Sequence, residues 1–289
     1  MVSGIGIKAR AFAELIRLDL AFGAGFFLVA GLVLALGMMP PPEMALAGFI
    51  MLFCISGAAN ISNDYFDREV DRINRRDRPL PSGRVTTHEL WGLFSISTLF
   101  GLVATAFFGL SVLALVILLW FVSLLYNVKI KDYGLAGNLV VAFCVGMTIV
   151  TGGITVGAVS GPVLLFGVLA FIFDLGEEIA SDAMDLEGDS LQASQSLAKT
   201  RGRKFALRTA GILFATFFLL TLVPFFTGWF GYGYLLLAVI LDLWMIRCTV
   251  RLLTDRSIEE GRMQVRRLYL SWGAFVIALV IYRILIGPS

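Results

Sequence analysis

Charged residues are scarce in this sequence. Only 15% of its 289 residues are Asp, Glu, Lys or Arg, whereas soluble domains average about 25%. Hydrophobic residues make up 58% of the chain, and the mean hydropathy is +0.87. This composition excludes a water-soluble domain of ordinary kind.

Other absences narrow the chemistry. The single histidine, His88, argues against a histidine-rich zinc site and against a Ser-His-Asp triad. Cys54, Cys144 and Cys248 lie in apolar segments with no pairing pattern, so we predict reduced thiols. Neither a phosphate-binding P-loop nor a dinucleotide-binding GxGxxG motif occurs.

Long apolar runs are abundant instead. Runs of about 20 residues, each enough to cross a ~30 Å hydrocarbon core, recur along the whole chain. The first, Ala21 to Met39, lacks a small-residue cleavage site and is predicted to be a span and not a signal peptide. We predict an all-α polytopic membrane protein, a single domain over residues 1–289 with about nine transmembrane helices at 12–38, 44–66, 89–108, 110–128, 134–158, 161–184, 205–226, 230–253 and 266–286.

Basic residues are distributed unevenly between these spans. No Lys or Arg occurs in the tight turns at 39–43, 108–111, 158–162 and 226–231. The other face receives the basic clusters at 68–84, 199–208 and 247–267, and also Lys8, Arg10, Lys129 and Lys131. Since loops rich in Lys and Arg stay in the cytoplasm, we expect a cell-membrane protein whose N-terminus and long loops are cytoplasmic.

Two acidic motifs lie at the ends of the second and sixth predicted spans. Their members are spaced four, three and four residues apart: Asn60, Asp64, Asp67 and Asp71 in the first motif, and Glu178, Asp182, Asp185 and Asp189 in the second. On an α-helix each set lies within roughly 60° of arc on one face. Glu69 and Glu187 fall on the opposite face. We therefore predict pseudo-repeated halves with acidic motifs at 60–71 and 178–189.

These acidic motifs need a neutralising partner. Carboxylates at a helix C-terminus oppose the helix dipole, and an acid costs ~2.5–3.5 kcal/mol at the centre of a bilayer. Three interpretations compete: a solvated helix end, a cation pathway in a transporter, and a divalent-metal site for a phosphorylated ligand. The shared face, the duplication and the nearby basic residues favour the third. Mg²⁺ prefers carboxylate oxygens and shares its coordination shell with substrate phosphates, so Mg²⁺ is the predicted cofactor.

The residues around the first motif resemble a known family. Asn63 to Asp71 reads NDYFDREVD, which is similar to the NDxxDxxxD motif of the UbiA superfamily of intramembrane prenyltransferases. Arg78 to Arg84, RPLPSGR, is similar to the RPxPSGR loop of that superfamily, and Asp185 to Asp189, DLEGD, resembles its second aspartate motif. Tyr126, Lys129 and Lys131 resemble the basic loop that follows the fourth span in this superfamily. Gly137 to Phe143 resembles the superfamily's fifth span.

The resemblance implies a UbiA-type helical bundle with a cytoplasmic-side active site. It implies catalytic and metal-binding roles for Asp64, Asp67, Asp71, Asp182, Asp185 and Asp189, with Asn63 and Glu178 as further metal ligands. Diphosphate contacts are expected from Arg78, Arg84, Lys129 and Lys131, and substrate contacts from Arg17, Asn60, Tyr126 and Asn138. The implied partners are a prenyl diphosphate, a lipid-soluble acceptor and membrane lipids. No nucleic acid and no obligatory protein partner is expected.

Within the superfamily, the basic loop, the fifth span and the EGD ending look most like archaeal digeranylgeranylglyceryl phosphate synthases. Those enzymes transfer a geranylgeranyl group from its diphosphate to geranylgeranylglyceryl phosphate. Chlorophyll synthases share related elements, so an aromatic, chlorophyllide or carotenoid acceptor stays open, and cation-coupled transport is the less favoured alternative. Departures from the family pattern at Glu177, Ser181 and Gln195 to Ala198 (QSLA in place of KTLP) leave the carboxylates in place and bear on the acceptor.

Two acids and several glycines lie inside the predicted spans. Asp174 and Asp242 lie within predicted spans six and eight, and each should have a polar partner or water. Asp174 lies one turn before Glu178 and is a candidate to support the second motif. Several glycines in the fifth span, at 146, 152, 153 and 157, are predicted to allow close helix packing.

Overall fold

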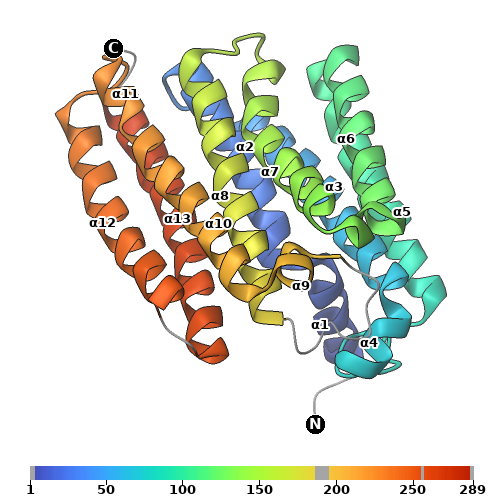
Figure 1. Ribbon diagram of the computed structural model, residues 1–289. Helices are drawn as coiled ribbons and strands as arrows, with labels where there is room; N and C mark the ends of the chain where they lie inside the picture. Colours follow the sequence, from blue (N-terminus) through green and yellow to red (C-terminus); the bar gives the residue numbers. More distant parts are fainter. Residues whose placement is uncertain (1–3, 186–194, 255–256, 287–289) are drawn as a thin grey trace. The chain divides into compact units, whose positions relative to one another are not determined.

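The computed structural model describes residues 4–185, 195–254 and 257–286, and every regular element in these ranges is helical (Figure 1). The all-α prediction is confirmed. By its internal contacts the chain divides into two compact units. The first comprises Met1–Val29 and Pro41–Ile130, and the second comprises Ala30–Pro40 and Lys131–Ser289. The first acidic motif lies in the first unit and the second motif in the second unit. That residues 1–289 act as a single domain stays a prediction.

The first unit consists of helices that pack around one long helix, α3 (Pro42–Phe66). In chain order they are α1 (Gly4–Ile16), the first part of α2 (Leu18–Leu36), α3 (Pro42–Phe66), α4 (Arg68–Asn74), α5 (Thr87–Thr105), the 3-10 helix η1 (Ala106–Phe108) and α6 (Leu110–Val128). Helix α3 carries most of the first motif. It packs against α1, α5 and α6.

The first predicted span, 12–38, is wrong at its start. Arg17 separates α1 from α2 because its backbone adopts φ 52°, in the left-handed region. No other non-glycine residue in the described ranges has a positive φ, and for such a residue this conformation costs of order 1–3 kcal/mol. The apolar run alone gave no sign of this break, and the membrane-crossing helix begins at Leu18.

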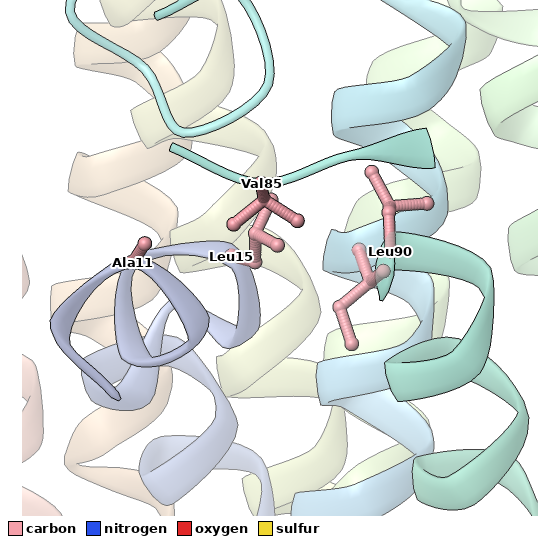
Figure 2. Close-up of a cluster of buried hydrophobic side chains, with 5 residues drawn as sticks. Ala11, Leu15, Val85 and Leu90 are labelled. Atoms are coloured by element: carbon pink, nitrogen blue, oxygen red, sulfur yellow. The ribbon is translucent and has the colours of Figure 1, made fainter. Parts of the chain in front are cut away.

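A buried hydrophobic cluster fixes the first motif's surroundings. Ala11 and Leu15 of α1, Ile61 of α3, Val85 of the loop after α4 and Leu90 of α5 are each at most 1% exposed and pack together. Figure 2 shows Val85 above Leu15, with Ala11 and Leu90 to either side. Ile61 lies one helical turn before the acidic part of the motif. The cluster therefore anchors α1 and the loop to α3 next to the motif.

The start of α5 is fixed by its own residues. Thr86 and Glu89 form a capping box, in which each side chain binds the other residue's backbone N–H. Glu89 also accepts a hydrogen bond from Lys8 Nζ at 2.7 Å. This ion pair joins α1 to α5 and so supports the arrangement that the hydrophobic cluster sets.

The second unit is also entirely helical in the described residues. After the remainder of α2 and the 3-10 helix η2 (Ile130–Tyr133), whose first residue belongs to the first unit, come α7 (Leu135–Thr155), α8 (Gly161–Asp185), α9 (Leu197–Arg201), α10 (Arg203–Thr221), α11 (Val223–Phe226), α12 (Tyr232–Thr254) and α13 (Ile258–Ile286). A Cβ atom at Gly146 would lie 2.7 Å from the carbonyl oxygen of Gly167. The predicted packing role is confirmed for this glycine, which lets α7 approach α8.

The membrane-crossing helices follow the predicted positions, with differences in number and bounds. Within the described residues, seven helices are long and apolar enough to cross a membrane. Helices α8 and α12, at the sixth and eighth predicted spans, have 25 and 23 residues but are not among the seven; α8 carries five acids in its second half. The number nine thus stays a prediction. Helix α13 begins at Ile258, earlier than the predicted 266.

We predict that Leu15→Ala lowers the free energy of unfolding of the protein by about 2–5 kcal/mol, since it removes a fully buried side chain and leaves a cavity. Thermal or denaturant unfolding in detergent would measure the loss. Leu110→Ala is the matched control, because Leu110 is 80% exposed. Equal stability of both variants would contradict the role assigned to the cluster.

Candidate active site

The first motif lies where α3 gives way to α4. Asp67 is the junction residue, with φ −86° and ψ −2°. Its backbone N–H donates to Asn63 O at 2.9 Å, and the N–H of Asp71 donates to Asp67 O at 2.8 Å. The predicted continuous helix through 60–71 is therefore divided at Asp67, but these hydrogen bonds keep the chain close to a helical course and preserve the spacing of the carboxylates.

Arg78 holds two of the predicted metal ligands. Its Nη1 atom lies 2.6 Å from Asp71 Oδ2 and 3.4 Å from Asp64 Oδ1. Asp64 is 4% exposed and Asp71 5%. Asp64 and Asp71 therefore share one guanidinium, which brings these two members of the motif together. Arg78 opens the RPLPSGR loop, so the loop closes back onto the motif that precedes it.

Arg17 is a second cationic partner of the Asp64 carboxylate. Its Nη2 atom donates to Asn63 Oδ1 at 2.9 Å and to Asp64 Oδ1 at 3.0 Å. The left-handed backbone of Arg17 turns the chain at this point. Asn60 fixes the turn from α3, because its Nδ2 donates to Ile16 O at 3.0 Å. Arg17, predicted to touch substrate, therefore lies beside the motif and is fixed there by Asn60, the first member of the motif and also a predicted substrate contact.

Sequence reasoning missed Asn127 of α6. It is 3% exposed, and its Nδ2 donates to Ala59 O and to Ser62 Oγ, both at 2.8 Å. Its Oδ1 accepts from Asn63 Nδ2 at 3.2 Å. Asn63 thus has its amide orientation set by Asn127 and Arg17. The available signal was an asparagine inside an otherwise apolar segment.

The local electrostatics favour added positive charge. Burial raises the pKa of the Asp71 carboxyl above its usual value, Arg78 acts to lower it, and the charges of Asp64 and Asp67 raise it further. One guanidinium therefore does not fully offset the loss of water and the repulsion between the carboxylates. A further cation would stabilise the ionised form of this motif.

Arg84, a predicted diphosphate contact, has other partners in this structure. Its Nη2 atom lies 2.6 Å from Glu14 Oε2 and also donates to Asp77 O. This guanidinium lowers the pKa of the Glu14 carboxyl. Of the other predicted contacts in this unit, Lys129 is exposed where α6 ends, and Tyr126 is half-buried. Arg84 is therefore directed toward α1, whereas Arg78 is directed toward the carboxylates.

The second motif occupies the last two turns of α8. Asn138 of α7, 6% exposed, donates from Nδ2 to Asp182 Oδ2 at 3.0 Å. The structure thus joins two residues that were predicted only separately. Glu178 and Lys131 are both half-buried. Asp189, together with Glu187 on the predicted opposite face, lies outside the described residues.

Arg262 of α13 is a further residue that sequence reasoning missed. Its Nη2 atom lies 2.8 Å from Asp185 Oδ1 and donates to Met184 O at 3.3 Å. Each motif therefore has an arginine on a carboxylate: Arg78 and Arg17 in the first unit, and Arg262 in the second. No sequence spacing links α13 to the second motif, so no local signal pointed to Arg262.

The segment after the second motif is held to the start of α7. Gln195 N–H donates to Asp132 O at 3.1 Å, and a Cβ atom at Gly134, where φ is +57°, would overlap Gln195 O. Ser196 begins α9 by accepting from Lys199 N–H at 3.3 Å. The QSLA departure from the family pattern thus lies against the loop that also carries Lys131.

The donor set fits a magnesium ion in its chemistry. In the described residues no three Asp, Glu, His or Cys side chains gather closely enough to hold a metal. The aspartates nevertheless offer the hard oxygen ligands that Mg²⁺ prefers, and Asp64 and Asp71 are buried carboxylates that are compensated by guanidinium groups. A metal would take over part of a charge-compensating role that Arg17 and Arg78 fill in this structure.

The structure is that of a polytopic membrane protein with a site for a charged ligand. Its helices are long enough to cross a membrane, and arginines bind carboxylates of both acidic motifs. The sequence matches the UbiA prenyltransferase family over residues 24–283. This chain belongs to that family and is a prenyltransferase; cation-coupled transport is set aside.

Similar proteins agree with this assignment. The digeranylgeranylglyceryl phosphate synthase of Methanococcus vannielii is 33% identical over 281 residues, which cover 94% of this chain and 97% of that protein. The enzyme of that name from Methanothermobacter thermautotrophicus is 37% identical over 173 residues, 59% of each chain.

Solved structures show the same fold. A digeranylgeranylglyceryl phosphate synthase structure superposes with a TM-score of 0.77 at 28% identity, covering 96% of this chain and 99% of that chain. A UbiA homologue from Archaeoglobus fulgidus, solved with GPP and Mg²⁺ bound, has a TM-score of 0.70 at 15% identity, with 95% and 99% covered. At that identity the second likeness concerns the fold alone.

We predict that Arg78→Gln destabilises the protein by leaving Asp71 buried without a cationic partner. The expected loss is about 2–3 kcal/mol, below the ~3–5 kcal/mol of a fully buried pair, because the Arg78 side chain stays 22% exposed. Unfolding in detergent without divalent metal would measure it. Adding Asp71→Asn to Arg78→Gln should recover part of the loss, and an Arg78→Gln variant as stable as the wild type would rule out this ion pair as a stabilising contact.

Proposed function

We propose that this chain is a Mg²⁺-dependent digeranylgeranylglyceryl phosphate synthase, which moves a geranylgeranyl group from geranylgeranyl diphosphate to geranylgeranylglyceryl phosphate and releases diphosphate. The supporting observation is the first motif, in which buried Asp64 and Asp71 bind arginines within a family-specific sequence. The near full-length similarity to the Methanococcus vannielii enzyme of that name supports the choice of acceptor.

The acidic residues of the two motifs would hold the metal. In the first motif these are Asp64, Asp67 and Asp71, with Asn63 beside them, and in the second they are Glu178, Asp182, Asp185 and Asp189. When bound, Mg²⁺ supplies positive charge that stabilises the departing diphosphate. A metal ion bound to these carboxylates would offset their negative charge in place of the arginines. Arg78 would then be available to donate hydrogen bonds to diphosphate oxygens, as a guanidinium does well.

The proposed reaction breaks one C–O bond and forms another. The allylic C–O bond breaks and its electron pair leaves with the diphosphate, while the acceptor hydroxyl oxygen forms the new C–O bond and loses its proton. Arg78, Lys129 and Lys131 would offset the charge that builds on the leaving group. The apolar helices exclude water, which would otherwise capture the allylic cation.

Arg17, a predicted substrate contact, is a candidate to bind the phosphate of the acceptor, and the structure supports a second candidate role. Its two hydrogen bonds to Asn63 and Asp64 support a role in orienting these predicted metal ligands. Asn127 supports the same orientation from α6. Both roles belong to the same proposal, because a guanidinium beside a metal-binding carboxylate is also placed to meet a phosphate.

The active site is proposed to open to the cytoplasm of a multi-pass membrane protein, with the N-terminus on the same side. The support is the uneven placement of Lys and Arg between the spans. Exposed Lys129, in a loop on the basic side, offers a position for a reporter cysteine. Reaction of that cysteine with an impermeant thiol reagent from outside intact cells would contradict this orientation.

The acceptor can be tested with radiolabelled geranylgeranyl diphosphate and a panel of acceptors. We expect the label to pass to geranylgeranylglyceryl phosphate, with release of diphosphate that EDTA abolishes and Mg²⁺ restores. Labelling of an aromatic acid but not of the glycerol phosphate lipid would overturn the proposed acceptor and leave the prenyltransferase assignment intact. Transfer that is unaffected by EDTA would overturn the metal requirement.

The metal-ligand assignment predicts that Asp67→Asn and Asp185→Asn each lower kcat by at least about 10²–10³-fold, the usual cost of removing a group that stabilises transition-state charge. Both proteins should remain folded. Glu69→Gln is the matched control, because Glu69 lies two residues from Asp67, pairs with Arg68 and Arg72, and is 63% exposed. Near-normal turnover in both Asp variants would remove these residues from the metal site.

A further inference from the structure

A groove of about 580 Å³ lies between α10 and α12 in the second unit, two helices that contact one another. Its volume falls within the range of small-molecule sites. Ten of its twelve lining residues are apolar or glycine, and the two polar ones are Asp242 and Thr249. Many of the apolar side chains, such as Leu219 and Leu243, are largely exposed. The groove is therefore open on its outer face, which meets hydrocarbon where α12 forms the predicted eighth span.

Asp242 is the unusual member of this lining. It is 6% exposed, and its Oδ2 atom accepts a hydrogen bond from Thr221 Oγ1 at 2.6 Å. The backbone of Thr221 is held in turn by Tyr234, whose hydroxyl donates to Thr221 O at 2.6 Å. The other oxygen, Asp242 Oδ1, has no hydrogen-bond partner in the described part of the chain. The sequence-based expectation of a polar partner is thus met at one oxygen only.

A buried carboxyl oxygen without a partner is costly, by ~1–3 kcal/mol or more. An ordered water needs two to four polar partners, and the lining offers few. The hydroxyl of Thr249 already donates to Met245 O at 2.9 Å. Acids within a span are by default functional candidates. Oδ1 therefore calls for a polar group carried into the groove by an otherwise apolar molecule.

We propose that this groove binds a neutral long-chain alcohol, with its hydroxyl on Asp242 Oδ1 and its chain along the apolar lining. A hydroxyl both donates and accepts, so it can satisfy Oδ1 whether or not the carboxyl carries a proton. A phosphate or carboxylate headgroup would be repelled by an ionised Asp242. An ammonium group would match only the ionised form.

Depth within the helix selects a single neutral alcohol over a phospholipid. Asp242 is near the middle of α12 (Tyr232–Thr254), about 15 Å along the axis from its start and about 18 Å from its end. A phospholipid headgroup stays at the edge of a ~30 Å hydrocarbon core and cannot reach this point. The lining residues of α12 extend from Val239 to Leu253, about 21 Å of helix, which is room for an extended chain.

This site is separate from the proposed active site. No residue of either acidic motif, and none of the predicted diphosphate or substrate contacts, lines the groove. The inference therefore stands independently of the acceptor proposed above. It assigns to α10 and α12 a lipid-binding role in addition to their structural one.

The test uses the full chain in phospholipid nanodiscs with two photoreactive probes, a diazirine-bearing hexadecanol and the matched diazirine-bearing hexadecane. Peptide mapping should place the alcohol's label on α10 and α12 at low probe concentration, and the hydrocarbon should label these helices far less. Asp242→Leu should weaken labelling by the alcohol about ten-fold, the factor expected from loss of one hydrogen bond to a buried carboxyl. Thr249→Val, the matched control in the same groove, should keep it.

A second variant covers the case in which Asp242→Leu does not fold. Ala215→Phe fills the groove from its exposed side and leaves Asp242 and Thr221 in place, and it should reduce labelling by the alcohol to a similar extent. Equal labelling by alcohol and hydrocarbon would overturn the proposal, because it would mean that the groove holds ordinary lipid tails. Labelling unchanged in Ala215→Phe would overturn it as well.

Discussion

The arrangement of the first motif depends on one electrostatic constraint: carboxylates removed from water need positive charge beside them. Asp64 and Asp71 are almost fully buried, and Arg17 and Arg78 supply that charge. The two arginines come from different parts of the chain, one from the turn between α1 and α2 and the other from the loop after α4. The constraint therefore shapes the backbone around the motif. Under the proposed function, a bound metal ion would supply part of this charge.

The fold was largely predictable because its signal is local. A helix inside a bilayer must satisfy its own backbone hydrogen bonds, so apolar runs of sufficient length become helices, and α6 has the predicted bounds, 110–128. One failure has a specific cause: Arg17 breaks the first span through a backbone conformation that hydropathy does not encode. Helix α8, 161–185, has nearly the predicted bounds of 161–184. It carries acids within its apolar length, so that it crosses the membrane stays a prediction.

The candidate site was predictable only in part. The spacing of the aspartates identified both motifs, and Arg78 was expected nearby because its loop follows the first motif in sequence. Asn127 and Arg262 were not, because each reaches its motif from a helix distant in sequence. Hydrogen bonds of this kind depend on tertiary packing. A periodicity argument places side chains on a face of a helix and says nothing about which partner that face meets.

The turn at Arg17 has a consequence for how this position can vary among mutants. Its left-handed backbone suits glycine best, yet glycine would abolish the contacts with Asn63 and Asp64. Lysine would keep the charge but would lose the planar guanidinium and keep the strain. Backbone and side chain thus make opposing demands, and no other residue type meets both. Position 17 should consequently be among the least tolerant in a saturation screen, although it lies outside both acidic motifs.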